Sequence, residues 1–209
     1  MASLSFYIVD VFAETKYAGN QLAVFTDAGH LSSEQMQEIA KEINFSETTF
    51  ILSPDLREGG YDVRIFTPTK ELPFAGHPTL GTAFVLQQFV IRQAVEQVNL
   101  NLSVGQIPVT ISYQNAHPDV LWMRPNPPTF GATVTADAIA PIFTLNTDDI
   151  DSHLPIQEVS TGVPFLIVPL KSLDALQRIY VNTDRLMTLV ENLQAKEVFV
   201  FCSETRHAN

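Results

Sequence analysis

Residues 71–90, ELPFAGHPTLGTAFVLQQFV, carry the strongest structural signal in this sequence. Pro78 suits the first turn of a helix, where its missing N–H group is harmless. The residues from Leu80 to Phe89 then make a helix that is apolar on most of its circumference. Such a helix must be buried. We therefore expect a central helix at about residues 78–90, with the rest of a domain wrapped around it.

Strand patterns lie on both sides of this helix. Apolar and polar residues alternate in 4–11, 61–65, 98–104 and 107–113, and two further short strands are expected at 21–25 and 48–52. Residues 33–43 instead carry apolar side chains at helical spacing, after a capping box formed by Ser32 and Gln35. Short, mostly antiparallel strands around an apolar helix indicate an α+β domain whose curved sheet wraps the helix.

The second part of the chain restarts the same pattern. The segment 117–131 is irregular and rich in proline, so we place a first domain at 1–115 and a second at 116–209. GVPFLIVPL (162–170) resembles GNQLAVFTD (19–27), a helix capped by Thr183 and Asp184 follows, and EVFVFC (197–202) corresponds to ETTFIL (47–52). These matches predict an internal duplication. The counterpart of 61–113, with its central helix, has no match, so we expect an incomplete second domain and a chain that is a fragment or one part of a two-chain protein.

Composition narrows the class of protein. The 209 residues carry a formal net charge of −11, which disfavours binding to nucleic acid and to anionic membranes. A single cysteine, Cys202, excludes an internal disulfide and favours the cytosol. The N-terminal stretch does not resemble a signal peptide, and no apolar run is long enough to span a bilayer. We find no metal-ligand spacing and no nucleotide-binding loop, and we expect no cofactor.

The first candidate for chemistry is Glu47, in Asn44-Phe45-Ser46-Glu47-Thr48-Thr49-Phe50. It lies where a predicted helix ends and a strand begins, and such junctions point side chains into clefts at the ends of sheets. Hydroxyl and apolar neighbours can tune the proton affinity of a carboxylate for acid/base work. The alternative is an ordinary solvated glutamate in a loop.

The second candidate is the pair Gly76 and His77, at the start of the central helix. The first backbone N–H groups of a helix bind anions, so a substrate carboxylate would fit there, and His77 could donate a hydrogen bond or a proton. Otherwise His77 merely caps the helix and Gly76 relieves crowding. Asn20 could place its amide in the same cleft, or only form a turn with Gly19.

These motifs resemble those of the phenazine-biosynthesis (PhzF-like) proteins. The similar stretches are GNQLAVF, QMQEIAKEINFSETTF and VRIFTPTKELPFAGHPTLGTAFVL, with weaker similarity through EVSTGVPFLIVPL. The resemblance implies a diaminopimelate-epimerase-like fold of two similar domains with the active site between them, an acid/base role for Glu47, and substrate binding by Gly76 and His77. It also implies a cofactor-free isomerase that is usually a homodimer. The family's second motif, resembling D-P-A-T-G-S-A, is not found before Asn209.

Three functions remain open on the sequence. The leading hypothesis is an isomerase that shifts a proton on a small carboxylic acid. The second is a catalytically silent module that binds a small acid or a partner. The third is a two-base racemase on the same fold, against which the lack of a second cysteine speaks, because Cys202 alone cannot supply two facing thiols.

Overall fold

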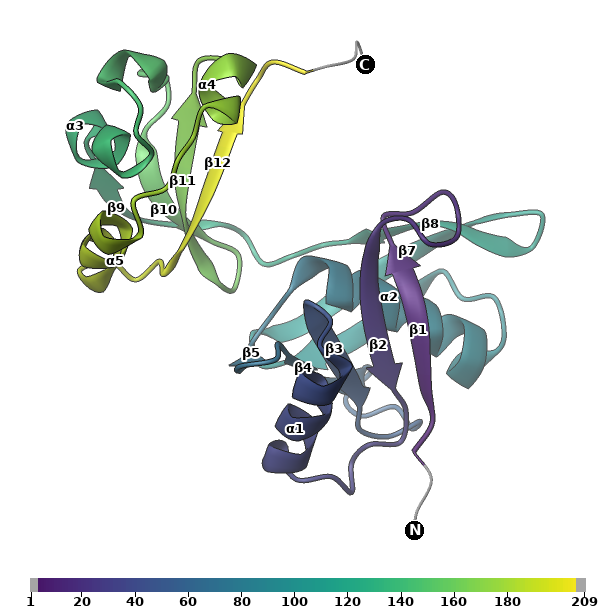
Figure 1. Cartoon of the computed structure of the whole chain (residues 1–209). Helices are drawn as coiled ribbons and strands as arrows, with labels where there is room; N and C mark the ends of the chain where they lie inside the picture. The colour runs from purple at the N-terminus through teal and green to yellow at the C-terminus, as the bar shows by residue number, and fades with distance from the viewer. Residues whose placement is uncertain (1–3, 206–209) are drawn as a thin grey trace. The chain divides into compact units, whose positions relative to one another are not determined.

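The computed structural model describes residues 4–205, which form two compact units (Figure 1). The chain passes from the first unit to the second between Asn126 and Pro127. We expected this boundary at 115/116. It lies later because residues 117–123 are not irregular: they form a strand of the first sheet.

The first unit is built on one large sheet. Its strands follow the order β1 (Phe6–Val11), β2 (Asn20–Phe25), β3 (Glu47–Ile51), β4 (Tyr61–Phe66), β6 (Gln97–Leu102), β7 (Gly105–Gln114) and β8 (His117–Met123), and the short β5 (Glu71–Leu72) pairs with β4. Neighbouring strands are antiparallel except for β2 with β3 and β4 with β6. The parallel pairing of β2 and β3 places the N-terminal ends of both strands at the same end of the sheet.

The central helix, α2 (Gly76–Val85), begins two residues before its predicted start and continues as a π-helix over Leu86–Ile91. It contacts β1, β2, β3 and β8, and most of its residues are buried (Figure 1). Gly81 allows this close packing, since a Cβ atom there would lie 2.6 Å from Leu22 Cδ2. The buried hydroxyl groups of Thr49 and Thr82, 2.8 Å apart, join the helix to β3.

The opposite face of β2 and β3 is covered by α1 (Ser33–Ile43), whose bounds agree with the prediction. Ser32 and Gln35 form both hydrogen bonds of the predicted capping box. Asn44 ends the helix with a φ angle of 56°, a left-handed conformation that asparagine tolerates. The capping box and the left-handed Asn44 therefore fix the two ends of this helix, and Glu47 follows three residues after its C-cap.

The second unit is a four-stranded sheet in the order β12 (Glu197–Cys202), β11 (Pro164–Leu170), β10 (Ile156–Ser160) and β9 (Thr129–Val134). The helices α3 (Ala136–Ile139), α4 (Leu173–Gln177) and α5 (Thr183–Glu191) and a short 3₁₀ turn at 140–142 contribute to its apolar core. A second 3₁₀ turn, at 147–149, lies outside that core. The predicted cap of α5 was wrong by one residue. The side chain of Asn182 accepts a hydrogen bond from the backbone N–H of Arg185, and Thr183 is the first helical residue.

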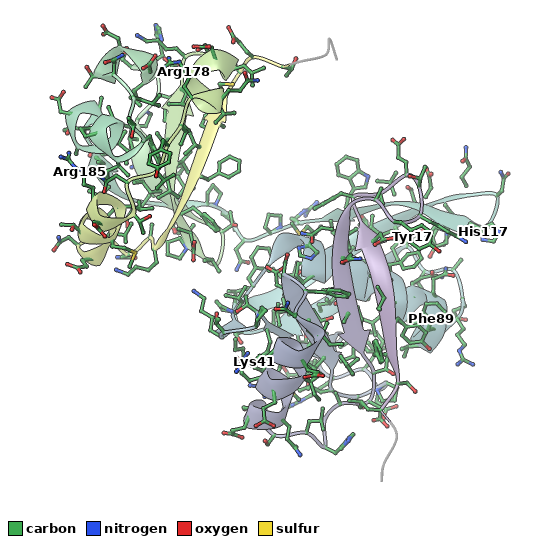
Figure 2. All side chains as sticks on the ribbon, in the orientation of Figure 1. Tyr17, Lys41, Phe89, His117, Arg178 and Arg185 are labelled. Atoms are coloured by element: carbon green, nitrogen blue, oxygen red, sulfur yellow. The ribbon has the colours of Figure 1, made fainter. Side chains whose placement is uncertain are left out.

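Figure 2 labels Arg178 of the second unit, an exposed side chain that pairs with two carboxylates. Arg178, labelled there, donates hydrogen bonds of 2.8 Å to the carboxylates of Asp149 and Asp174.

In the first unit, Tyr17 is 94% exposed on the loop between β1 and β2. Within residues 4–205, no helix has both the length and the apolar character that crossing a membrane requires.

The two units repeat the order predicted from the sequence. In each, an antiparallel pair (β1–β2 and β10–β11) is followed by helix and then by a strand parallel to the second member (β3 and β12). The registers agree, because Leu22 pairs with Glu47 and Phe165 pairs with Glu197. In the first unit α2 covers the face that carries Leu22 and Thr49. On the equivalent face of the second unit, Phe165 and Phe199 are 36% and 55% exposed.

Candidate active site

The candidate site lies at the end of the sheet where β2, β3 and α2 all begin. Asn20 is the first residue of β2, Glu47 is the first residue of β3, and His77 lies in the first turn of α2. The parallel register sets Glu47 opposite Leu22, two residues along β2 from Asn20. Three segments far apart in the sequence thus contribute side chains to one place.

The side chains of these residues form a continuous chain of contacts. Glu47 Oε2 lies 3.5 Å from His77 Nε2, and the other ring nitrogen, Nδ1, lies 3.3 Å from the amide nitrogen of Asn20. The imidazole is therefore held between an amide and a carboxylate. The structure brings together Glu47, His77 and Asn20 and sets Gly76 directly before the histidine.

Burial changes the proton affinity of both ionisable groups. The side chains of His77 and Glu47 are 8% and 18% exposed. Loss of water raises the pKa of the Glu47 carboxyl above its ordinary value. It also lowers the pKa of His77, and the backbone of Gln21 offsets part of that effect. Both shifts disfavour the charged forms, which weakens any ion pair across the 3.5 Å contact.

The two atoms that face each other are also unsatisfied. Glu47 Oε2 and His77 Nε2 are both buried and have no hydrogen-bond partner, because 3.5 Å is too long for a good hydrogen bond. Buried polar atoms without partners are rare in folded proteins and need an explanation. An ionised carboxylate oxygen needs a donor and an imidazole N–H needs an acceptor, so these two atoms together suit a ligand group that does both, such as a hydroxyl.

Glu158 in the second unit shows that burial alone does not produce this state. Its side chain is also buried, but its oxygens accept hydrogen bonds from the backbone N–H groups of Ala132 and Ala195, at 3.0 and 2.7 Å. These donors lower the pKa of Glu158, the opposite of the change at Glu47. Glu158 is a structural carboxylate, whereas Glu47 is buried without such donors.

Gly76 opens α2 and lies close to β8. A Cβ atom at this position would lie 3.1 Å from Cε of Met123 on β8, which is closer than ordinary van der Waals contact. The N-cap residue, Ala75, has no side chain that could cap the helix. The first-turn N–H groups therefore stay available for an anion. Met123 was missed by the sequence analysis because prolines on both sides hid the alternation of β8.

No cluster that could hold a metal ion emerges from the part of the chain that the structure describes: nowhere in residues 4–205 do three or more His, Cys, Asp or Glu side chains gather suitably. Cys202 lies at the end of β12, where it is partly buried and has a free thiol group. It packs at the edge of the apolar core of the second unit.

Comparison with known proteins finds relatives that match most of this chain. The family described as "Phenazine biosynthesis-like protein" matches residues 9–209. A trans-2,3-dihydro-3-hydroxyanthranilate isomerase from Pseudomonas fluorescens is 37% identical over 84% of this chain and 60% of its own length. An uncharacterized isomerase from Mesorhizobium japonicum is 30% identical over 98% of this chain and 70% of its own length. The chain thus spans about three fifths to seven tenths of these relatives.

Solved structures confirm the predicted fold. A predicted epimerase from Pseudomonas aeruginosa superposes with a TM-score of 0.83 at 33% identity, over 95% of this chain and 70% of that one. A hydroxyproline epimerase from Agrobacterium vitis, 13% identical, covers 90% of this chain and 57% of its own with a TM-score of 0.52, and shares the fold alone. The matched sequence and the shared fold place this chain in the phenazine biosynthesis-like (PhzF-like) protein family, in which the relatives described above are isomerases.

Proposed function

We propose that this protein is a cofactor-independent isomerase that shifts a proton on a small cyclic or amino-acid-like carboxylic acid, with Glu47 as the acid/base. The observation that carries the proposal is the buried, unpartnered Oε2 atom of Glu47 beside His77. A carboxyl group with a raised pKa holds and releases a proton closer to neutral pH than an exposed one.

The proposed step uses only groups of the site and the substrate. Glu47 takes a proton from one carbon of the substrate and returns it to another carbon on the same face, so that atoms and charge balance without a co-reactant. The electron pair released by the first transfer moves through the substrate to the second carbon. His77 stabilises the negative charge that develops between the two transfers.

The carboxylate of the substrate is proposed to lie at the start of α2. The N–H groups of Gly76 and His77 and the positive end of the helix dipole would bind it. The name of the Pseudomonas fluorescens relative specifies a cyclic amino acid with a ring hydroxyl, and this supports the same class of substrate for the present chain.

The test is turnover by Glu47→Gln in the full chain, with trans-2,3-dihydro-3-hydroxyanthranilate first and a panel of cyclic amino and hydroxy acids after it. We expect kcat to fall by about 100-fold or more. The matched control is Glu42→Gln, an exposed glutamate of α1 in the same unit, which should keep wild-type turnover. Unchanged turnover by Glu47→Gln would end the proposal. Calorimetric binding by wild type without turnover of any acid would favour the silent binding module instead.

We also propose a homodimer in the cytosol, as the family resemblance implies. Sedimentation equilibrium of the full chain should give twice the mass of the chain. A single-chain mass at the highest concentration tested would contradict the dimer.

A further inference from the structure

The contact between Asn20 and His77 bears on which ring nitrogen carries the proton. The amide nitrogen of Asn20 lies 3.3 Å from Nδ1 of the imidazole. An amide NH₂ group only donates hydrogen bonds, and a neutral imidazole has one nitrogen with a proton and one with a lone pair. A donor at Nδ1 therefore requires the lone pair at Nδ1 and the proton at Nε2.

We infer that Asn20 is a positioning residue that fixes His77 in the tautomer with its proton on Nε2, on the side of the ring that faces the carboxyl group of Glu47. The catalytic role of this tautomer rests on the proposed function, whereas the tautomer itself can be measured without it. It differs from a role for Asn20 in binding substrate, since the amide nitrogen is already engaged by the ring.

This tautomer divides the work of the site between its two ionisable groups. With its proton on Nε2, a neutral His77 can donate a hydrogen bond at the reacting position but cannot accept a proton there. Of these two groups, Glu47, whose Oε2 lies 3.5 Å from Nε2, is then the base, and His77 is the donor that stabilises negative charge on the substrate.

A competing arrangement exists and defines the opposite outcome. A hydrogen bond between the His77 ring and the backbone of Gln21 raises the pKa of the ring and so favours its protonated form. A ring that donated from Nδ1 to this backbone would leave the lone pair on Nε2, facing Glu47. His77 would then be a second base, and Asn20 would have no influence on it.

The test is the ¹⁵N NMR spectrum of the histidine rings in the substrate-free full chain at neutral pH, with the His77 signals assigned from a His77→Gln sample. We expect a protonated Nε2 and an unprotonated Nδ1. In Asn20→Asp, the carboxylate accepts from Nδ1, so the tautomer should reverse or the ring should become charged. Asn99→Ala is the matched control, because Asn99 lies in the same unit and bonds the Gly59 carbonyl group instead of a ring.

A wild-type ring with its proton on Nδ1 would overturn the inference, and so would Asn20→Asp with the wild-type tautomer. The wild-type spectrum decides even if a variant fails to fold. In the kinetic assay, Asn20→Asp should lower kcat at least about tenfold, as loss of an orienting partner does elsewhere. If Glu47→Gln retained activity while the tautomer was as expected, the proposed function would fail and the placement by Asn20 would stand.

Discussion

The hydroxyl pair of Thr49 and Thr82 gives the sharpest test of how the central helix is held. Both residues are fully buried, and their Oγ1 atoms are 2.8 Å apart. Thr49 lies two residues after Glu47 on β3, and Thr82 lies five residues after His77 on α2. This hydrogen bond therefore sets the distance between the two elements that carry the site.

Replacing each threonine by valine keeps the shape and removes the hydroxyl group. Thr82→Val leaves the Thr49 hydroxyl facing apolar atoms, which should cost about 2 kcal/mol. Thr49→Val should cost less, about 1 kcal/mol, because the Thr82 hydroxyl can turn to the backbone carbonyl group four residues earlier in its own helix. The double variant loses both partners together and should be within about 1 kcal/mol of wild type. The pair should then show a coupling energy of about 2 kcal/mol.

The assay is urea unfolding, followed by circular dichroism and by fluorescence of Trp122, which lies on β8 of the same unit. The slope of the free energy of unfolding against urea should be unchanged, so that the shift in midpoint measures stability. A double variant as unstable as the sum of the two single variants would contradict a coupled hydroxyl pair. It would mean that each threonine acts independently of the other.

Three further predictions concern other features of the structure. Ser32→Ala removes the cap of α1 and should lower the free energy of unfolding by about 1 kcal/mol in urea unfolding, and no change would contradict the cap. Gly19→Ala should cost more than about 1 kcal/mol, since φ is +79° and a Cβ atom would lie 2.3 Å from the carbonyl oxygen of Val11; equal melting temperatures would refute this. Glu47→Gln should gain stability over wild type as the pH rises from 4.5 through the raised pKa of Glu47. In that window the folded wild type binds more protons than the unfolded chain and so loses stability with rising pH, and a pH-independent difference in unfolding scans would argue against it.

The sequence predicted most accurately the elements whose ends are set by local chemistry. The bounds of α1 follow from the Ser32 capping box and from Asn44, so they could be predicted to the residue. The cap of α5 was placed one residue late because Asn182, Thr183 and Asp184 are all capable caps. Only the backbone conformation of Asn182 decides among them.

Features that depend on pairing across the sheet were harder to predict. β8 was taken for irregular chain at the start of the second domain because Pro118 and Pro125 lie in and just beyond it, although its partner β7 holds it in the first unit. The π-helix at 86–91 ends at Arg92 with a φ angle of 58°, and nothing in its sequence distinguishes it from the α-helix before it.

For the site, the sequence supplied the candidates but not their contacts. Glu47 and His77 are thirty residues apart, and only the parallel pairing of β2 with β3, together with α2 beside them, brings the carboxyl group to the imidazole. The contact of Asn20 with His77 spans 57 residues and has no local signal. Burial of the facing atoms could not be foreseen, because it depends on all the neighbours of both residues.

The proton affinity of Glu47 can be measured by a ¹³C NMR titration of the side-chain carboxyl groups in the substrate-free protein, with the Glu47 signal assigned by its loss in Glu47→Gln. We predict a midpoint for Glu47 above 4.5 and, in the same spectra, a midpoint for the hydrogen-bonded Glu158 below 4.5. A Glu47 midpoint at or below 4.5 would contradict the claim that this carboxyl group is buried without donors and poised to carry a proton.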